Sequence, residues 1–89
     1  MIRQKIEIIN KLGLHARAAA KFVTTASAYK SDVQLIKGER EVNGKSIMGV
    51  MMLAAAKGSI LELVVNGDDE AAAVNKIIAL IGNRFGEDE

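Results

Sequence analysis

The sequence Ile60-Leu61-Glu62-Leu63-Val64-Val65 is apolar and branched apart from one glutamate. This composition is typical of an inner strand of a sheet. Gly58 precedes the run, and the acidic sequence Gly67-Asp68-Asp69-Glu70 follows it. Acidic groups stabilise the positive end of a helix, so we expect the last helix to begin there. The stripe that this helix buries is predicted to comprise Val74, Ile77, Ile78, Ile81 and Phe85.

The preceding residues alternate between strand and helix periodicities. Ile2, Ile6 and Ile8 share a parity among charged neighbours, which predicts a strand over 2–9. Apolar residues repeat at steps of three and four from Ala16, which predicts a helix over 16–28. Val33 and Leu35 alternate with polar residues, and Gly38 separates them from a short polar arm at 40–42, as in a hairpin. Ser46 is then a suitable N-cap for a short helix over 47–54.

The predicted order is therefore β-α-β-β-α-β-α. Four short strands and three helices indicate an α+β fold of two layers, in which the helices cover one face of the sheet. A chain of 89 residues with 49% hydrophobic and 26% charged residues is expected to fold as one domain, 1–89.

The composition excludes several classes of function. The chain has no cysteine and a single histidine, so we expect no disulfide, no zinc site and no metal or other cofactor. Its few aromatic residues and the lack of a Lys/Arg cluster argue against nucleic-acid binding. No apolar run approaches the roughly 20 residues of a membrane span, and the first residues lack a signal-peptide pattern. We therefore expect a cytoplasmic monomer without membrane insertion.

Charge is distributed unevenly along the chain. Residues 1–45 carry nine Lys/Arg against four Asp/Glu, whereas residues 46–89 carry three against seven. Two explanations of this asymmetry are equally good. One is an ordinary scatter of charges over the surface, and the other is a basic face around the single histidine.

That histidine lies in the sequence Gly13-Leu14-His15-Ala16-Arg17, at the start of the first predicted helix. A helix N-terminus has unpaired backbone N–H groups and a partial positive charge, and it attracts anions. Both the helix dipole and Arg17 favour a neutral imidazole with a nucleophilic nitrogen. A phosphoryl group on that nitrogen would meet the N–H groups of Ala16, Arg17 and Ala18 and the Arg17 guanidinium. The alternative is a histidine that only caps the helix beside a solvated arginine.

The run Asn10-Lys11-Leu12-Gly13-Leu14-His15-Ala16-Arg17, with Lys45-Ser46-Ile47-Met48 farther along, resembles the HPr family over essentially the whole chain. HPr proteins are the histidine-containing phosphocarriers of the phosphoenolpyruvate-dependent phosphotransferase system. The resemblance implies an open-faced β-sandwich whose antiparallel sheet has the order 1-4-2-3. It also implies that His15 carries the phosphoryl group on Nδ1, that Arg17 stabilises it, and that the group passes from Enzyme I to IIA proteins or domains. The family usually has proline where this chain has Ala18.

The helix predicted after Ser46 has apolar residues on two sides. We expect Val50 and Leu53, and with them Met52, to be buried, and Ile47, Met48 and Met51 to stay exposed as a docking surface. The resemblance implies that this helix meets Enzyme I and IIA, and Lys21 and Lys45 would add positive charge for docking.

Several alternatives remain open at this stage. The resemblance implies that a serine kinase phosphorylates Ser46 in some bacteria, so the chain could act as a regulatory module, or in the nitrogen-related rather than the sugar-transporting branch of the system. A self-contained enzyme is not expected, because the sequence has neither a nucleophile elbow nor a Gly-rich phosphate loop.

Overall fold

The computed structural model describes all residues, 1–89, and contains one four-stranded antiparallel sheet. Its strands are β1 (Ile2–Glu7), β2 (Asp32–Lys37), β3 (Arg40–Asn43) and β4 (Ile60–Asn66). The helices are α1 (Ala16–Ser27), α2 (Ile47–Met52) and α3 (Glu70–Gly82), and a 3₁₀ turn, Arg84–Gly86, follows α3. None of these helices combines the length and the apolar composition that a bilayer span requires.

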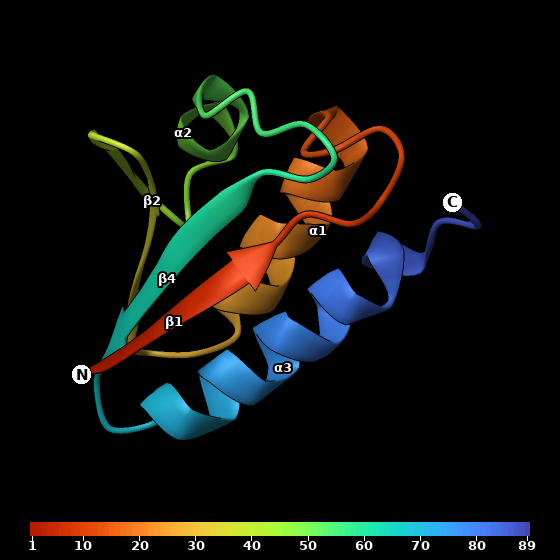
Figure 1. Cartoon of the computed structure of the whole chain (residues 1–89). Coiled ribbons are helices and arrows are strands. Elements are labelled where there is room, and N and C mark those ends of the chain that lie inside the picture. The colour runs from red at the N-terminus through yellow and green to blue at the C-terminus, as the bar shows by residue number, and fades with distance from the viewer.

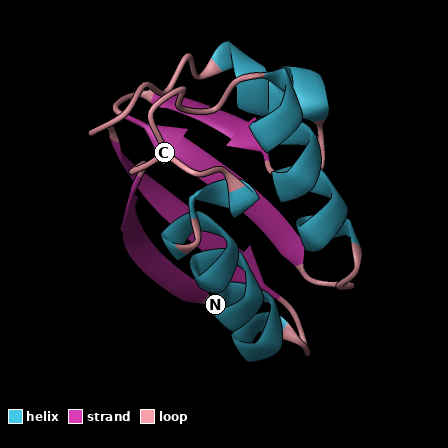
Figure 2. Cartoon of the chain, turned by 90° about the vertical axis from the view of Figure 1, so that its right-hand side faces the viewer, coloured by secondary structure: helices cyan, strands magenta, loops and turns pink.

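The sheet has the order β1-β4-β2-β3, and all three helices lie on one of its faces (Figures 1 and 2). The predicted fold class and strand order are thus confirmed. β4 is an inner strand, with Ile6 of β1 opposite Leu61 and Leu35 of β2 opposite Leu63. The core lies between the sheet and the helices, where alternate residues of β4 meet Phe22 of α1 and Ile77 of α3.

The buried side of α3 is narrower than the sequence predicts. Val74, Ile77, Ile81 and Phe85 are buried as expected, but 40% of Ile78 is exposed. Successive residues of a helix are about 100° apart, which turns Ile78 toward the rim of the helix. There it lines a shallow surface hollow beside β1, an edge strand of the sheet, where no further element covers it.

The element ends also differ by a few residues from the predicted ones. β1 ends at Glu7, although Ile8 still exchanges backbone hydrogen bonds with residues 58–59. α2 ends at Met52, and Ala54 adopts a left-handed φ of 48°. Arg40 donates a hydrogen bond to the carbonyl of Met52 at 2.6 Å, and Lys37 donates one to the carbonyl of Leu53 at 3.2 Å. Cationic side chains of the β2–β3 hairpin thus bind carbonyl groups that have no helical partner at the end of this short helix.

Asp69 ties the start of α3 to the turn between α1 and β2. Its carboxylate accepts hydrogen bonds from the backbone N–H groups of Lys30 (2.8 Å) and Ser31 (3.0 Å) and from the Ser31 hydroxyl. The hydroxyl bond, followed by the Lys30 N–H bond, holds the pKa of the Asp69 carboxyl below its usual range. A carboxyl with a lowered pKa stabilises the fold above its unfolded-state pKa and loses that contribution as the pH falls through the folded-state value.

We expect Asp69→Asn to lower the melting temperature at neutral pH, because the amide NH₂ group cannot accept the bonds that a carboxylate oxygen accepts. The difference between the variant and wild type should shrink as the pH falls through the lowered folded-state pKa of Asp69, because the wild-type carboxyl is then protonated too. Thermal unfolding followed by circular dichroism over a series of pH values from neutral to strongly acidic measures this. Asp68→Asn is the matched control, since Asp68 makes none of these contacts. Equal melting temperatures for the two variants at neutral pH would contradict the tether.

Candidate functional site

The loop that leads to His15 is held in place by a close backbone contact. Gly13 has a φ of 69°, and a Cβ atom there would lie 2.4 Å from the carbonyl oxygen of Ala55. The next residue, Leu14, donates its N–H to the same oxygen at 2.9 Å. Only glycine fits at residue 13, because the two loops approach each other too closely there for a side chain. The close contact between the loops positions the start of α1.

His15 is the N-cap of α1, as predicted. Its backbone is extended, with φ −70° and ψ 176°, and its carbonyl accepts the first helical bond from Ala19 at 2.8 Å. The imidazole Nδ1 accepts a hydrogen bond from the backbone N–H of Arg17 at 3.3 Å. Only 23% of the side chain is exposed. The ring thus lies against the N-terminal turn of the helix with its Nδ1 edge turned to that turn.

The backbone groups predicted to contact a phosphate differ in their accessibility. Ala16 and Arg17 are exposed, whereas Ala18 is completely enclosed. No backbone oxygen of the protein accepts the N–H of Ala16 or Ala18. Ala18 packs into the core beneath the first turn, and the contact of these three N–H groups with a phosphate stays a prediction.

The structure adds Glu87, which the sequence argument missed. The carboxylate contacts Nε2 of His15 across 72 residues of sequence, and only 15% of the Glu87 side chain is exposed. Phe85, buried and left-handed with φ 55°, turns the chain back toward α1, and Lys21 donates to its carbonyl at 2.6 Å. The hydrogen bond from Asn10, followed by that from His15, holds the pKa of the Glu87 carboxyl below its usual range.

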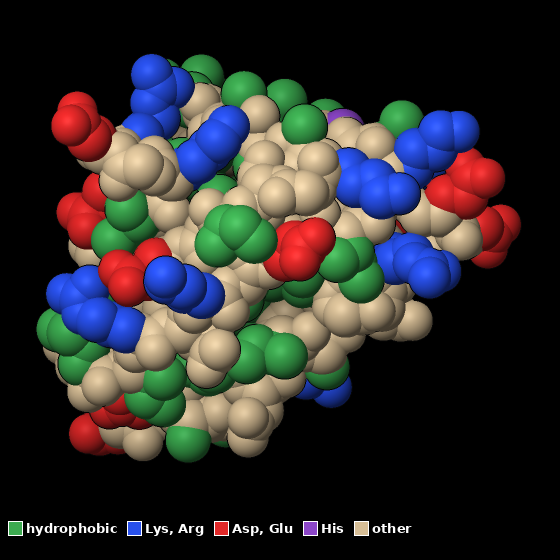
Figure 3. Space-filling model, viewed as in Figure 1, with side chains coloured by type: hydrophobic (Ala, Val, Ile, Leu, Met, Phe, Trp, Pro, Cys, Tyr) green, Lys and Arg blue, Asp and Glu red, His purple; other side chains and the backbone are tan.

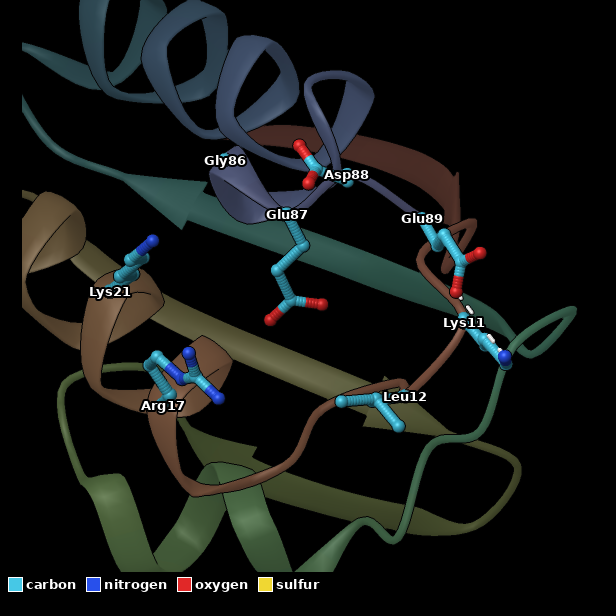
Figure 4. Close-up of a pocket in the computed structure, with 8 residues that line it drawn as sticks. All are labelled: Lys11, Leu12, Arg17, Lys21, Gly86, Glu87, Asp88 and Glu89. Atoms are coloured by element: carbon cyan, nitrogen blue, oxygen red, sulfur yellow. Dashed lines mark ion pairs between the residues drawn. The ribbon is translucent and has the colours of Figure 1, made fainter.

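A depression of about 600 Å³ lies between the start of α1 and the C-terminal residues (Figure 4). Two of its lining residues, Arg17 and Glu87, contact the imidazole of His15. Three basic side chains line it, from Lys11, Arg17 and Lys21, together with three acidic ones from residues 87–89. Lys11 pairs with Glu89 at 3.2 Å. The interpretation of a purely basic face around His15 is therefore wrong, because the acidic end of the chain folds back onto the basic residues.

Comparisons with known proteins identify the family of the chain. The family described as "PTS HPr component phosphorylation site" matches residues 2–83. The phosphocarrier protein HPr of Neisseria meningitidis is 60% identical over 89 residues, all of both chains.

The chain belongs to the HPr family.

Solved structures show the same family. A crystal structure of HPr from Thermoanaerobacter tengcongensis matches with a TM-score of 0.96 and 46% identity, covering 100% of both chains. The Bacillus subtilis catabolite repression protein Crh matches with a TM-score of 0.76 and 44% identity, covering 94% of this chain and 97% of Crh, and its structure is described as a swapped dimer. The HPr family comprises phosphocarrier proteins of the phosphotransferase system. The monomeric state expected for this chain stays a prediction.

In this HPr protein, the apolar surface of α2 lies next to the histidine. Met48 is 75% exposed, and Ile47 and Met51 are exposed as predicted. Met52 is exposed as well, contrary to the expectation, because the buried side of the helix is limited to Val50 and the adjoining Leu53. We call the four exposed residues the α2 apolar surface; Figure 3 shows hydrophobic side chains along this edge of the molecule, beside the histidine. Leu12, also exposed, lines the depression on the other side and was not foreseen.

The two docking lysines expected from the sequence lie apart: Lys21 is in the middle of α1, and Lys45 contacts the chain beyond the end of that helix. Lys21 lines the depression. Lys45 donates to the carbonyl of Tyr29 at 2.7 Å, just beyond the last turn of α1. A helix of 12 residues is about 18 Å long, so the Lys45 ammonium is remote from His15.

Ser46 is the N-cap of α2, as predicted. Its Oγ accepts a hydrogen bond from the N–H of Gly49 at 3.1 Å. The residue is half-buried and directly precedes the exposed Ile47 and Met48. A charge on Ser46 would therefore border the α2 apolar surface.

Proposed function

We propose that this HPr protein accepts a phosphoryl group from phospho-Enzyme I on Nδ1 of His15 and passes it to IIA proteins or domains, in sugar uptake or in its regulation. The observation that carries the proposal is the orientation of the imidazole. Nε2 is turned to Glu87, whereas Nδ1 is turned to the start of α1, where the Arg17 N–H lies 3.3 Å away. The Arg17 guanidinium makes no hydrogen bond or ion pair with the protein, and so it is available to a phosphoryl group.

The reaction needs one nucleophilic nitrogen and groups that neutralise phosphate oxygens. The lone pair of Nδ1 attacks phosphorus, while the bond from phosphorus to the donor breaks and its electron pair stays with the donor. The N–H groups of Ala16 and Arg17 and the planar guanidinium then pair with the phosphoryl oxygens. The second transfer repeats these steps with His15 as the leaving group. The protein is thus a covalent relay and not an enzyme by itself.

The α2 apolar surface and Leu12 flank the histidine and would form the contact with both partners. Methionine side chains adapt to different shapes, which suits one surface that must meet Enzyme I and several IIA proteins. A small apolar contact with charged groups at its border favours rapid and transient association.

The direct test uses purified protein, Enzyme I and phosphoenolpyruvate. We expect one phosphoryl group per chain that is labile in acid and stable in base, as a phosphohistidine is, and that moves to an added IIA protein. Absence of uptake by the wild-type chain would leave the purely regulatory role, because a regulatory module takes up no acid-labile phosphate.

Regulation through Ser46 is a second candidate function, exercised by a serine kinase. What favours it is the position of Ser46, half-buried at the cap of α2 and next to two exposed residues of the apolar surface. A phosphate there would place about two negative charges at the border of the docking surface.

We expect Ser46→Asp to keep the melting temperature and to slow phosphoryl transfer from Enzyme I. Aspartate caps a helix about as well as serine, but its charge lies beside apolar residues that must be buried in the complex. Ser46→Ala is the opposite control: it loses a cap of about 1 kcal/mol and keeps the transfer rate. Rapid-quench kinetics measure the transfer rate of each variant, and thermal melts measure its stability. If both variants transfer at the same rate, Ser46 is only a cap.

A further inference from the structure

A chain of hydrogen bonds connects the core to the imidazole. Asn10 is fully buried, and its Nδ2 donates to the carbonyl of Gly13 at 2.8 Å and to Oε1 of Glu87 at 3.0 Å. Its Oδ1 has no partner. Both neighbours of Nδ2 are acceptors only, so the orientation of the amide follows from chemistry. Asn10 therefore presents N–H groups, and no acceptor, to residue 87.

The other oxygen of Glu87 contacts Nε2 of His15. An ionised carboxylate only accepts hydrogen bonds, so the proton of the imidazole is on Nε2. On the opposite edge of the ring, Nδ1 accepts from the Arg17 N–H. An N–H group only donates, so Nδ1 carries no proton. The two contacts, made by different ends of the chain, specify the same tautomer.

We propose that Glu87, held by Asn10, is a positioning residue that sets the Nε2–H tautomer of His15 and keeps this proton in place while the phosphoryl group is on Nδ1. The inference rests on the proposed function, because it assigns to Glu87 a part in the phosphoryl relay. It extends that function by a residue from the C-terminal segment that touches neither phosphorus nor the incoming oxygens.

The proton balance explains why such a residue matters. When Nδ1 bonds to phosphorus, the ring becomes cationic as long as Nε2 keeps its proton, and this cation faces the Glu87 carboxylate. When the Nδ1–P bond breaks, its electron pair returns to Nδ1 and a neutral imidazole leaves. No proton moves in either direction. A ring without the Nε2 proton would have to leave as an imidazolate anion, which is a far poorer leaving group.

Other charges around the ring are balanced or farther removed. Arg17 of α1 acts on the Glu87 carboxylate, Lys11 of the loop is paired with Glu89, and Lys21 and Asp88 complete the lining of the depression. Figure 4 shows Glu87 pointing from the C-terminal segment toward the start of α1, with Arg17 beside it. Among the acidic side chains, only Glu87 contacts the imidazole.

The variant Glu87→Gln gives a sharp test because it keeps the size of the side chain. Asn10 offers only N–H groups, so the oxygen of Gln turns to Asn10 and its NH₂ group turns to Nε2. Two donors then face each other unless the ring gives up its Nε2 proton. We expect about a tenfold change in the ratio of tautomers toward Nδ1–H, the equivalent of one net hydrogen bond, measured by ¹⁵N NMR of the unphosphorylated protein.

A second readout uses the phosphorylated protein. Loss of the carboxylate charge makes the phosphorylated ring give up its Nε2 proton more readily. The pH at which transfer to IIA slows should therefore fall by about one unit in Glu87→Gln. Glu89→Gln is the matched control, because it removes one charge from the same depression without touching His15. We expect the control to keep both the wild-type tautomer and the wild-type pH profile.

The outcomes are distinct. A wild-type ring with its proton on Nδ1, or Glu87→Gln and Glu89→Gln variants that behave alike in both measurements, would overturn the role of Glu87. Failure of the wild-type chain to take up phosphate would overturn the proposed function, while the NMR measurement still decides which residue sets the tautomer. Glu87→Ala, which offers no donor to Nε2, should lie between wild type and Glu87→Gln in tautomer ratio.

Discussion

Replacing His15 with alanine is expected to abolish phosphoryl uptake from Enzyme I completely, because the chain contains no second histidine. The fold should survive. His15 lies at the N-cap of α1 outside the hydrophobic core, and loss of a cap costs about 1 kcal/mol. For a domain of this size, that corresponds to a fall of roughly 5 °C in melting temperature.

His15→Asn is the control that separates the two roles of this residue. Asparagine is a good N-cap but not a nucleophile, so this variant should melt like the wild type and still take up no phosphate. Radiolabelled phosphoenolpyruvate with Enzyme I measures uptake, and circular dichroism measures the melting temperature. Labelled phosphate on either variant would show that another residue is the acceptor.

Arg17→Lys is expected to slow transfer from Enzyme I by about 10- to 100-fold, because an ammonium group cannot reproduce the two parallel bonds of a guanidinium to phosphate oxygens. Stability should not change, since the Arg17 side chain makes no hydrogen bond or ion pair within the protein. Arg17 faces Glu87 across the depression, so the positive charge retained by lysine also leaves the electrostatics of that carboxylate nearly intact.

Arg3→Lys is a suitable control for the same chemical change at a distance. Arg3 lies on β1, where it pairs with Glu62 at 2.9 Å on the sheet. We expect this variant to transfer at the wild-type rate in rapid-quench experiments. If Arg17→Lys does so too, Arg17 is a solvated surface charge and the phosphoryl group is stabilised by backbone N–H groups alone.

The periodic parts of the fold could be predicted from the sequence because their signals are local. The alternation in 60–65 and the three- and four-residue steps after Ala16 each occupy one element, and both elements are found where expected. The caps His15 and Ser46 were also predictable, because a cap bonds to an N–H group only two or three residues away. Ile78 was misplaced because its burial depends on what lies beyond β1, which no local pattern records.

For the site, the sequence alone was enough to single out His15 and Arg17, because they lie two residues apart at a helix start and because the motif around them resembles the HPr family. The environment of the imidazole depends instead on the folded chain. Glu87 is 72 residues from His15, Asn10 reaches Glu87 across 77, and nothing local to 87–89 distinguishes one acidic residue from another. Their roles differ because Phe85 is anchored in the core and turns Glu87, and not Glu89, onto Nε2. Local bonding fixes helices, strands and caps, whereas contacts between the two ends of the chain exist only once the hydrophobic core has brought α1 and α3 together.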